Sequence, residues 1–175
     1  MDLAGSACFS PCGGYRWWLE RRWDPQAPPL LFIGLNPSRA DGQRDDPTLR
    51  RLQALARSWG YGRLEVLNLF ARIAASPAVL RRCSDPVGVE NDHWLEQRLR
   101  LLPAVGALWL GWGNGGSWRG RDRAVLERLA PLALPQLVIG LTAQRQPRHP
   151  LYARGDAQPQ LLQQPGVPLR VATPC

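Results

Sequence analysis

Lysine is absent from the 175-residue chain, and all 22 of its basic side chains are arginine. A mechanism that passes through a lysine Schiff base is therefore excluded. Long apolar runs are also missing, since no stretch approaches the roughly 20 apolar residues of a membrane-spanning helix. The first residues show no basic start followed by an apolar run, which argues against a signal peptide. We expect a cytoplasmic protein that does not enter a membrane.

Cysteine is sparse as well, with four residues at Cys8, Cys12, Cys83 and Cys175. In the cytosol such residues are normally reduced thiols. The Cys8-x-x-x-Cys12 spacing is half of a metal or iron–sulfur site, but no second close pair and no spaced histidine pair completes one. We expect free thiols, no metal and no cofactor. A cluster that uses all four cysteines is the alternative.

The net charge is +8 and the isoelectric point is about 10.6. The planar guanidinium group of arginine binds phosphate groups and stacks on bases, so this charge favours nucleic acid or a nucleotide as the partner. A genome biased toward arginine codons would produce the same charge without such a partner.

Strands and helices alternate along the chain. Apolar, strand-like runs occupy residues 30–36, 63–71, 106–114 and 135–142. Amphipathic, helix-like segments lie between them, at about 46–60, 89–102 and 121–133. Helical crossovers of this length join parallel strands. The pattern predicts an α/β fold, a three-layer α/β/α sandwich around a central, mostly parallel four-stranded sheet.

The two ends of the chain are less clear. We predict one domain over residues 1–175, with residues 1–29 as an N-terminal extension that packs on the core and residues 155–175 as a C-terminal tail. Within the extension, "YRWWLERRW" (15–23) fits either an edge strand or a short helix. The tail fits a short helix or an edge strand.

Polar or glycine-rich groups follow every predicted strand. In open parallel sheets, ligands bind beyond the carboxyl ends of the strands, so these groups predict a common cleft. The candidate binding residues are Gly34, Pro37, Ser38, Asp46, Asn68, Arg72, Trp112, Asn114, Arg148 and Tyr152, and the candidate catalytic residues are Asn36, His149 and Asp45.

Several of these candidates also have a structural interpretation. Asn36 precedes a proline and can cap a turn, or it can hold a water or read the edge of a base. Asp46 most simply caps the following helix, which would leave Asp45 free to act as a general base. Trp112 and Tyr152 fit either the edge of the core or a platform on which a base stacks.

The two histidines differ in their surroundings. His149 lies between Arg148 and Pro150 in a stiff loop, which suits a group that faces a ligand. His93 lies near a helix start, where a surface or capping role is the simpler interpretation.

Seven motifs together closely resemble an uncharacterised bacterial family, domain of unknown function 1643. They are "YRWWLERRW", "GLNPSRAD", "DDPTLRRL", "NLFARIAASP", "PVGVENDHWL", "GWGNGG" and "GLTAQRQPRHPLYAR". The resemblance covers about residues 9–154, nearly the whole chain. It implies a relative but no activity.

A more distant resemblance implies a specific reaction. Gly34-Leu35-Asn36-Pro37-Ser38 is similar to the Gly-Ile-Asn-Pro-Gly motif of mismatch-specific uracil-DNA glycosylases. Residues 148–152 resemble a variant of the His-Pro-Ser loop of the same superfamily, although Leu151 and Tyr152 replace its small residues. The resemblance implies that Asn36 holds the attacking water and His149 stabilises the departing base.

The function expected from this resemblance is hydrolysis of an N-glycosidic bond in nucleic acid, as in DNA repair. Such a reaction needs a donor near the negative charge that builds on the base, and a polar group beside the water. The alternative is a nucleotide-binding or nucleic-acid-binding protein that uses the same cleft without cleavage.

Overall fold

The computed structural model describes residues 4–162. Its strands are β1 (Ala4–Phe9), β2 (Arg16–Arg22), β3 (Pro29–Gly34), β4 (Arg63–Asn68), β5 (Ala107–Leu110), β6 (Gln136–Val138) and β7 (Gln160–Leu161). Its α-helices are α1 (Pro47–Ser58), α2 (Pro77–Arg81), α3 (Asn91–Leu101) and α4 (Arg121–Leu129), with 3-10 helices η1 (Gly113–Gly120) and η2 (Pro150–Tyr152).

All seven strands form one sheet in the order β1-β2-β4-β3-β5-β6-β7. The α/β fold with a mostly parallel central sheet is confirmed. The expectation of four strands is wrong, because three antiparallel strands extend the sheet beyond the four predicted ones. Strands β4, β3, β5 and β6 run parallel. At one side β2 pairs antiparallel with β4 and β1 pairs antiparallel with β2, and at the other side β7 pairs antiparallel with β6.

The two ends of the chain supply these additional strands. The segment that fitted either a strand or a helix is β2, and it pairs with β4 on one side and with β1 on the other. The expected N-terminal extension therefore contributes two strands to the sheet itself. In the tail, β7 pairs with β6. Residues 163–175 lie outside the described part of the chain.

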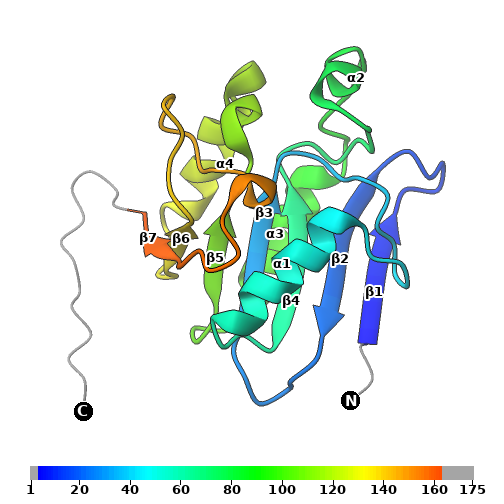
Figure 1. The fold of residues 1–175 in the computed structure, drawn as a ribbon. Coiled ribbons are helices and arrows are strands. Elements are labelled where there is room, and N and C mark those ends of the chain that lie inside the picture. Colours follow the sequence, from blue (N-terminus) through cyan, green and yellow to red (C-terminus); the bar gives the residue numbers. More distant parts are fainter. Residues whose placement is uncertain (1–3, 163–175) are drawn as a thin grey trace.

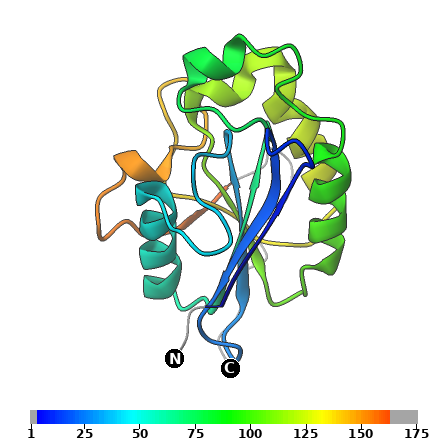
Figure 2. The ribbon, with the colours of Figure 1, turned by 90° about the vertical axis from the view of Figure 1, so that its right-hand side faces the viewer.

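Helices cover both faces of the sheet (Figures 1 and 2). Figure 2 shows α1 and η2 on one face, and α3 and α4 on the other. Alternation along β3 explains the two layers, because successive side chains of a strand point to opposite faces. Leu30 and Phe32 join the apolar cluster under α1, while Leu31 and Ile33 join the cluster under α3 and α4.

The start of α1 is fixed by its own sequence. The Asp46 carboxylate accepts a hydrogen bond from the Leu49 backbone N–H at 2.7 Å, and Pro47 occupies the first turn. Both features are typical of helix N-termini. The expected cap is therefore confirmed, and it places the beginning of α1 beside the carboxyl end of β3. Among residues 4–162, none of the helices is long and apolar enough to cross a membrane.

Candidate functional site

A cleft lies at the carboxyl ends of β3 and β4, on the face that α1 covers. It holds about 360 Å³ of empty space, counting its open mouth. Its apolar lining comes from Phe32, Leu35, Ala40, Leu49, Leu52 and Val66, and its remaining lining comes from Arg16, Gly34, Asn36, Ser38, Asp46, Thr48, Asn68 and His149. Six of our candidate residues therefore meet here: Gly34, Asn36, Ser38, Asp46, Asn68 and His149.

The glycine at the end of β3 makes room for neighbouring side chains. A Cβ atom on Gly34 would lie 2.8 Å from Cε1 of Phe32 and 3.1 Å from Oδ1 of Asn68. Both distances are too short for ordinary packing. Gly34 thus lets the ring of Phe32 and the amide of Asn68 approach the strand end, and so shapes the cleft before any ligand enters.

Asn36 presents its amide in one orientation. Its Nδ2 donates to the carbonyl oxygens of Pro37 at 2.9 Å and Ala74 at 3.0 Å. Only the NH2 side of a carboxamide can donate, so these two carbonyls fix which way the group points. The Oδ1 atom has no donor among the described residues and is left to accept a hydrogen bond from a water or a ligand.

Asn68 is buried, with 4% of its surface exposed. Its Nδ2 has no hydrogen-bond partner within residues 4–162. A buried donor without an acceptor costs roughly 1–3 kcal/mol. Because this amide lines the cleft, a ligand or a water in the cleft can supply the missing acceptor.

His149 lies on the segment that connects β6 to η2. Its Nδ1 accepts a hydrogen bond from the Leu151 backbone N–H at 3.3 Å. In a neutral imidazole, that bond places the proton on Nε2, which therefore serves as a donor. Burial lowers the pKa of His149 below its ordinary value of 6.5, so the ring is neutral at pH 7.

This lowered pKa makes stability depend on pH. The unfolded chain takes up a proton on this histidine near its ordinary pKa, whereas the folded chain takes it up only at lower pH. The folded form is therefore penalised as pH falls through about 6.5 toward the lowered pKa. We expect the free energy of unfolding to fall over this window in the wild type, and to fall less in His149→Gln.

Chemical denaturation at a series of pH values measures this difference. NMR titration of the imidazole in a His93→Gln background reports the His149 pKa directly, because one histidine then remains. A His149 pKa at or above 6.5 would contradict the structure.

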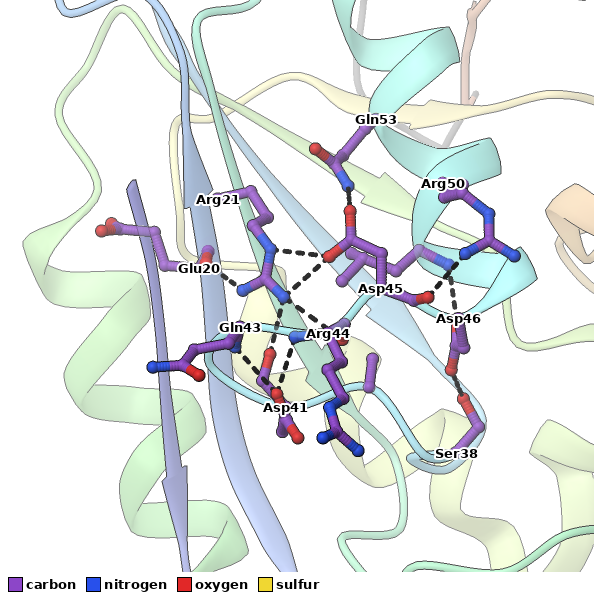
Figure 3. Close-up of polar contacts among 12 residues, drawn as sticks. Glu20, Arg21, Ser38, Asp41, Gln43, Arg44, Asp45, Asp46, Arg50 and Gln53 are labelled. Carbon is purple, nitrogen blue, oxygen red and sulfur yellow. Dashed lines mark hydrogen bonds and ion pairs between the residues drawn. The ribbon is translucent and has the colours of Figure 1, made fainter. Parts of the chain in front are cut away.

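The two neighbouring aspartates have separate tasks (Figure 3). Asp46 lines the cleft, and besides capping α1 it accepts a hydrogen bond from the Ser38 hydroxyl. Asp45 is absent from the cleft lining. One of its oxygens accepts from Nε of Arg21 at 2.9 Å and the other accepts from Nε2 of Gln53. Asp45 is therefore not the spare carboxylate that we expected, and its contacts hold the loop.

The third strand end contributes nothing to the cleft lining. Trp112 is 1% exposed, packs in the core and donates to Gln146 Oε1 at 2.8 Å. Of our two interpretations of this tryptophan, the core position is the one that the structure gives. Asn114 is exposed and accepts from the Thr142 hydroxyl at 2.6 Å. Only Asn36, Asn68 and His149 of the four strand-end groups therefore share the cleft.

Four further candidates lie outside the lining, and one of them, Pro37, accepts a hydrogen bond from Nδ2 of Asn36 through its carbonyl oxygen. Tyr152 is 80% exposed, and its ring centre lies 6.0 Å from that of His149. Arg148 is exposed, and Arg72 places its guanidinium over the ring of Tyr15. Tyr152 is thus an exposed aromatic side chain beside the cleft's histidine, while Arg72 has a structural partner.

Besides Thr48 in the first turn of α1, sequence reasoning missed a second polar residue of the cleft, Arg16. It comes from β2, which is not one of the four parallel strands, so the rule about strand ends does not reach it. The segment also fitted two secondary structures. No spacing in the sequence marks this arginine as different from Arg21 or Arg22.

Cys8, Cys12 and Cys83 are free thiols. Cys175 lies outside the described residues. Within residues 4–162, no group of three or more histidine, cysteine, aspartate or glutamate side chains is arranged to hold a metal ion.

Fold and cleft define an α/β protein with a polar site at the carboxyl edge of a mostly parallel sheet. The model of the family described as "Protein of unknown function (DUF1643)" matches residues 16–151. The chain belongs to this family, and the match includes every residue that lines the cleft. No curated protein matches the chain. No solved structure matches it either.

Proposed function

We propose that the protein hydrolyses the N-glycosidic bond of a base in nucleic acid, on a fold like that of uracil-DNA glycosylases. The observation that carries this proposal is the meeting of Asn36, Asn68 and His149 in one cleft. Each comes from a different segment, and each presents a hydrogen-bonding atom that has no partner among the described residues. These are one acceptor and two donors, which suit a water and a base respectively.

The proposed reaction divides its work among these groups. Asn36 Oδ1 holds a water, whose oxygen forms a bond to C1′ of the sugar. The bond from C1′ to the base nitrogen breaks, and its electron pair leaves with the base. Nε2–H of the neutral His149 stabilises the negative charge that builds on that base. Asp46, a carboxylate in the same cleft, takes the proton that the water loses.

A base inside a duplex must be flipped out to reach such a cleft. Arginine side chains can neutralise the phosphates of the backbone, and the exposed ring of Tyr152 can stack on a base. DNA repair in the cytoplasm of a bacterium is the setting that this function implies.

The second candidate is a protein that binds a nucleotide or nucleic acid without cleaving it. The positions of the two aspartates favour this alternative, because Asp45 is held by Arg21 and Gln53 while Asp46 already accepts two hydrogen bonds. Both candidates use the same cleft. They differ in whether a bond breaks.

The deciding experiment is a panel of duplex and single-stranded oligonucleotides that carry uracil, xanthine or modified bases. Released bases are detected by mass spectrometry. We expect at least one substrate to lose its base. Binding to the same oligonucleotides with no released base from any of them would refute the hydrolase and support the binding protein.

On the best substrate, His149→Ala should reduce kcat about 100-fold while the substrate Kd changes by less than about threefold. Negative charge on the base appears only in the transition state, so removing the hydrogen bond from His149 that stabilises this charge slows the chemical step. His93→Ala is the matched control, because His93 is exposed on α3. Equal losses in kcat and in binding would contradict the role of His149.

A further inference from the structure

Arg16 is a buried cation that no carboxylate of the described residues contacts. The residue is 4% exposed and lines the cleft. Its Nη1 donates to the carbonyl oxygen of Ala40 at 2.9 Å. Its Nε is buried without a partner, and within residues 4–162 no acidic oxygen lies within 4.0 Å of the guanidinium. The Nε and Nη2 atoms, which form one edge of the guanidinium, therefore have no hydrogen-bond acceptor in the described part of the chain.

The other buried arginines show how unusual this is. Arg21 pairs with the Asp45 carboxylate, and Arg121 pairs with the Asp92 carboxylate. Each also donates to backbone carbonyl oxygens. A guanidinium taken out of water normally needs such compensation, because desolvating a charge costs several kcal/mol. Arg16 is the buried arginine whose compensation the described residues leave incomplete.

Burial also affects the acid–base equilibrium of this group. Desolvation lowers the pKa of Arg16 to about 10, and the negative charge of Asp46 acts against that decrease. The group is still a cation at neutral pH. It therefore presents a full positive charge to the cleft.

The chemistry of the missing partner follows from two donors in the same cleft. The free edge of Arg16 and the Nδ2 of Asn68 both lack an acceptor. A guanidinium edge binds two oxygens of an anionic group at once, and such charge-assisted bonds are about twice as strong as neutral ones. The ligand atom that suits both donors is an oxygen that carries negative charge.

We propose that Arg16 and Asn68 form an oxyanion subsite in the cleft. Within the proposed function, on which this inference rests, the anionic oxygen has two sources. It belongs either to a phosphate of the bound nucleotide or to the departing base, on which charge builds as the bond breaks. In both cases Arg16 is a substrate-binding residue from a strand outside the parallel core.

Inorganic phosphate and free xanthine are the two probes, each titrated into the full chain by calorimetry. Xanthine is used at mildly alkaline pH, where part of it is anionic. We expect at least one probe to bind the wild type. Arg16→Gln should then weaken that probe roughly 10- to 100-fold, since a charged hydrogen bond is lost. Arg22→Gln removes the same charge from the same strand and should change the affinity less than about twofold.

The phosphate and xanthine titrations distinguish the two sources of the anionic oxygen. Weaker binding of phosphate alone assigns the subsite to a phosphate, and weaker binding of xanthine alone assigns it to the base. Affinities that Arg16→Gln leaves unchanged for both probes would overturn the subsite. The absence of any binding by the wild type up to about 10 mM of either probe would overturn it too.

A measurement on the wild type covers the case in which Arg16→Gln does not fold. The Nε–H resonance of Arg16, assigned through its own side-chain carbons, should shift as the bound probe saturates. An unshifted resonance at saturation would refute the contact.

The subsite and the hydrolase can fail separately. Phosphate binding through Arg16 without released base from any oligonucleotide would keep the subsite and refute the hydrolase. Base release that Arg16→Gln leaves unaffected would keep the hydrolase and refute the subsite.

Discussion

Asn36→Ala is expected to slow base release about 100- to 10,000-fold while binding of the same oligonucleotide changes little. Its Oδ1 is the acceptor that would orient the attacking water, and positioning of a proton-transfer or water-holding group contributes about this much. Alanine leaves space for the water but gives it no fixed direction. The rate constant comes from single-turnover base release, and binding comes from fluorescence anisotropy.

Asn114→Ala is the matched control for this change. Asn114 also follows a parallel strand, and its side chain accepts one hydrogen bond, from the Thr142 hydroxyl. It lies outside the cleft lining. Its replacement should leave the rate within about twofold of the wild type. Equal effects of the two alanine variants would show that Asn36 has no special part in the chemistry.

Asn36→Ala also removes the hydrogen bond to the Ala74 carbonyl, so the effect of this substitution on stability needs a separate measurement. A lost hydrogen bond of this kind costs about 1 kcal/mol. Chemical denaturation of Asn36→Ala should show a decrease of about 1 kcal/mol in the free energy of unfolding, and no larger one. If the variant loses its rate but is substantially unfolded under assay conditions, the loss belongs to the fold and the role of Asn36 is not supported.

Six of the fourteen residues that line the cleft could be predicted from the sequence, because the geometry of parallel strand ends is simple. Parallel strands bring their carboxyl ends to one edge, so Asn36 after β3 and Asn68 at the end of β4 had to lie near each other. His149 joins them because the segment after β6 crosses back toward α1. Asn114 does not join them, since η1 begins there and the side chain turns to Thr142. The end of a strand predicts the edge of the sheet at which a residue lies. The conformation of the following loop determines whether its side chain reaches the cleft.

Adjacent acids were harder to assign from the sequence. Either Asp45 or Asp46 could have been left free, and the difference depends on Arg21, a residue more than 20 positions earlier. Arg16 was missed for a related reason, because β2 pairs with the parallel sheet from outside it. Two of the three additional strands also lack a sequence signal of their own: β1 contains alanine, glycine and serine, and β7 is two residues long. The sequence of β2 fitted an edge strand, but it fitted a short helix as well.

Arg21→Met should destabilise the protein by about 3–5 kcal/mol, the usual cost of breaking a buried, hydrogen-bonded ion pair from one side. Arg21 is 1% exposed and donates to the Asp45 carboxylate, to the Asp41 carbonyl at 2.6 Å and to the Glu20 carbonyl at 2.9 Å (Figure 3). The substitution leaves the Asp45 carboxylate without its cation, and the carbonyls of Asp41 and Glu20 without this donor. Urea denaturation measures the loss.

Arg22→Met is the control for the charge, because Arg22 follows directly in β2 and its side chain is 48% exposed. It should cost less than about 1 kcal/mol. A similarly small loss for Arg21→Met would mean that the loop between β3 and α1 holds its shape without this arginine.

The same substitution also tests how the cleft is built. The loop that Arg21 holds joins β3 to α1, and it includes Asn36 and Asp46, which both line the cleft. Arg21 contacts the loop between them, on Asp41 and Asp45, and does not line the cleft itself. In conditions where Arg21→Met is still folded, we therefore expect weaker oligonucleotide binding and slower base release together, whereas Asn36→Ala affects only the rate. A folded Arg21→Met variant with both quantities unchanged would show that the cleft is shaped by the parallel strands and α1 alone.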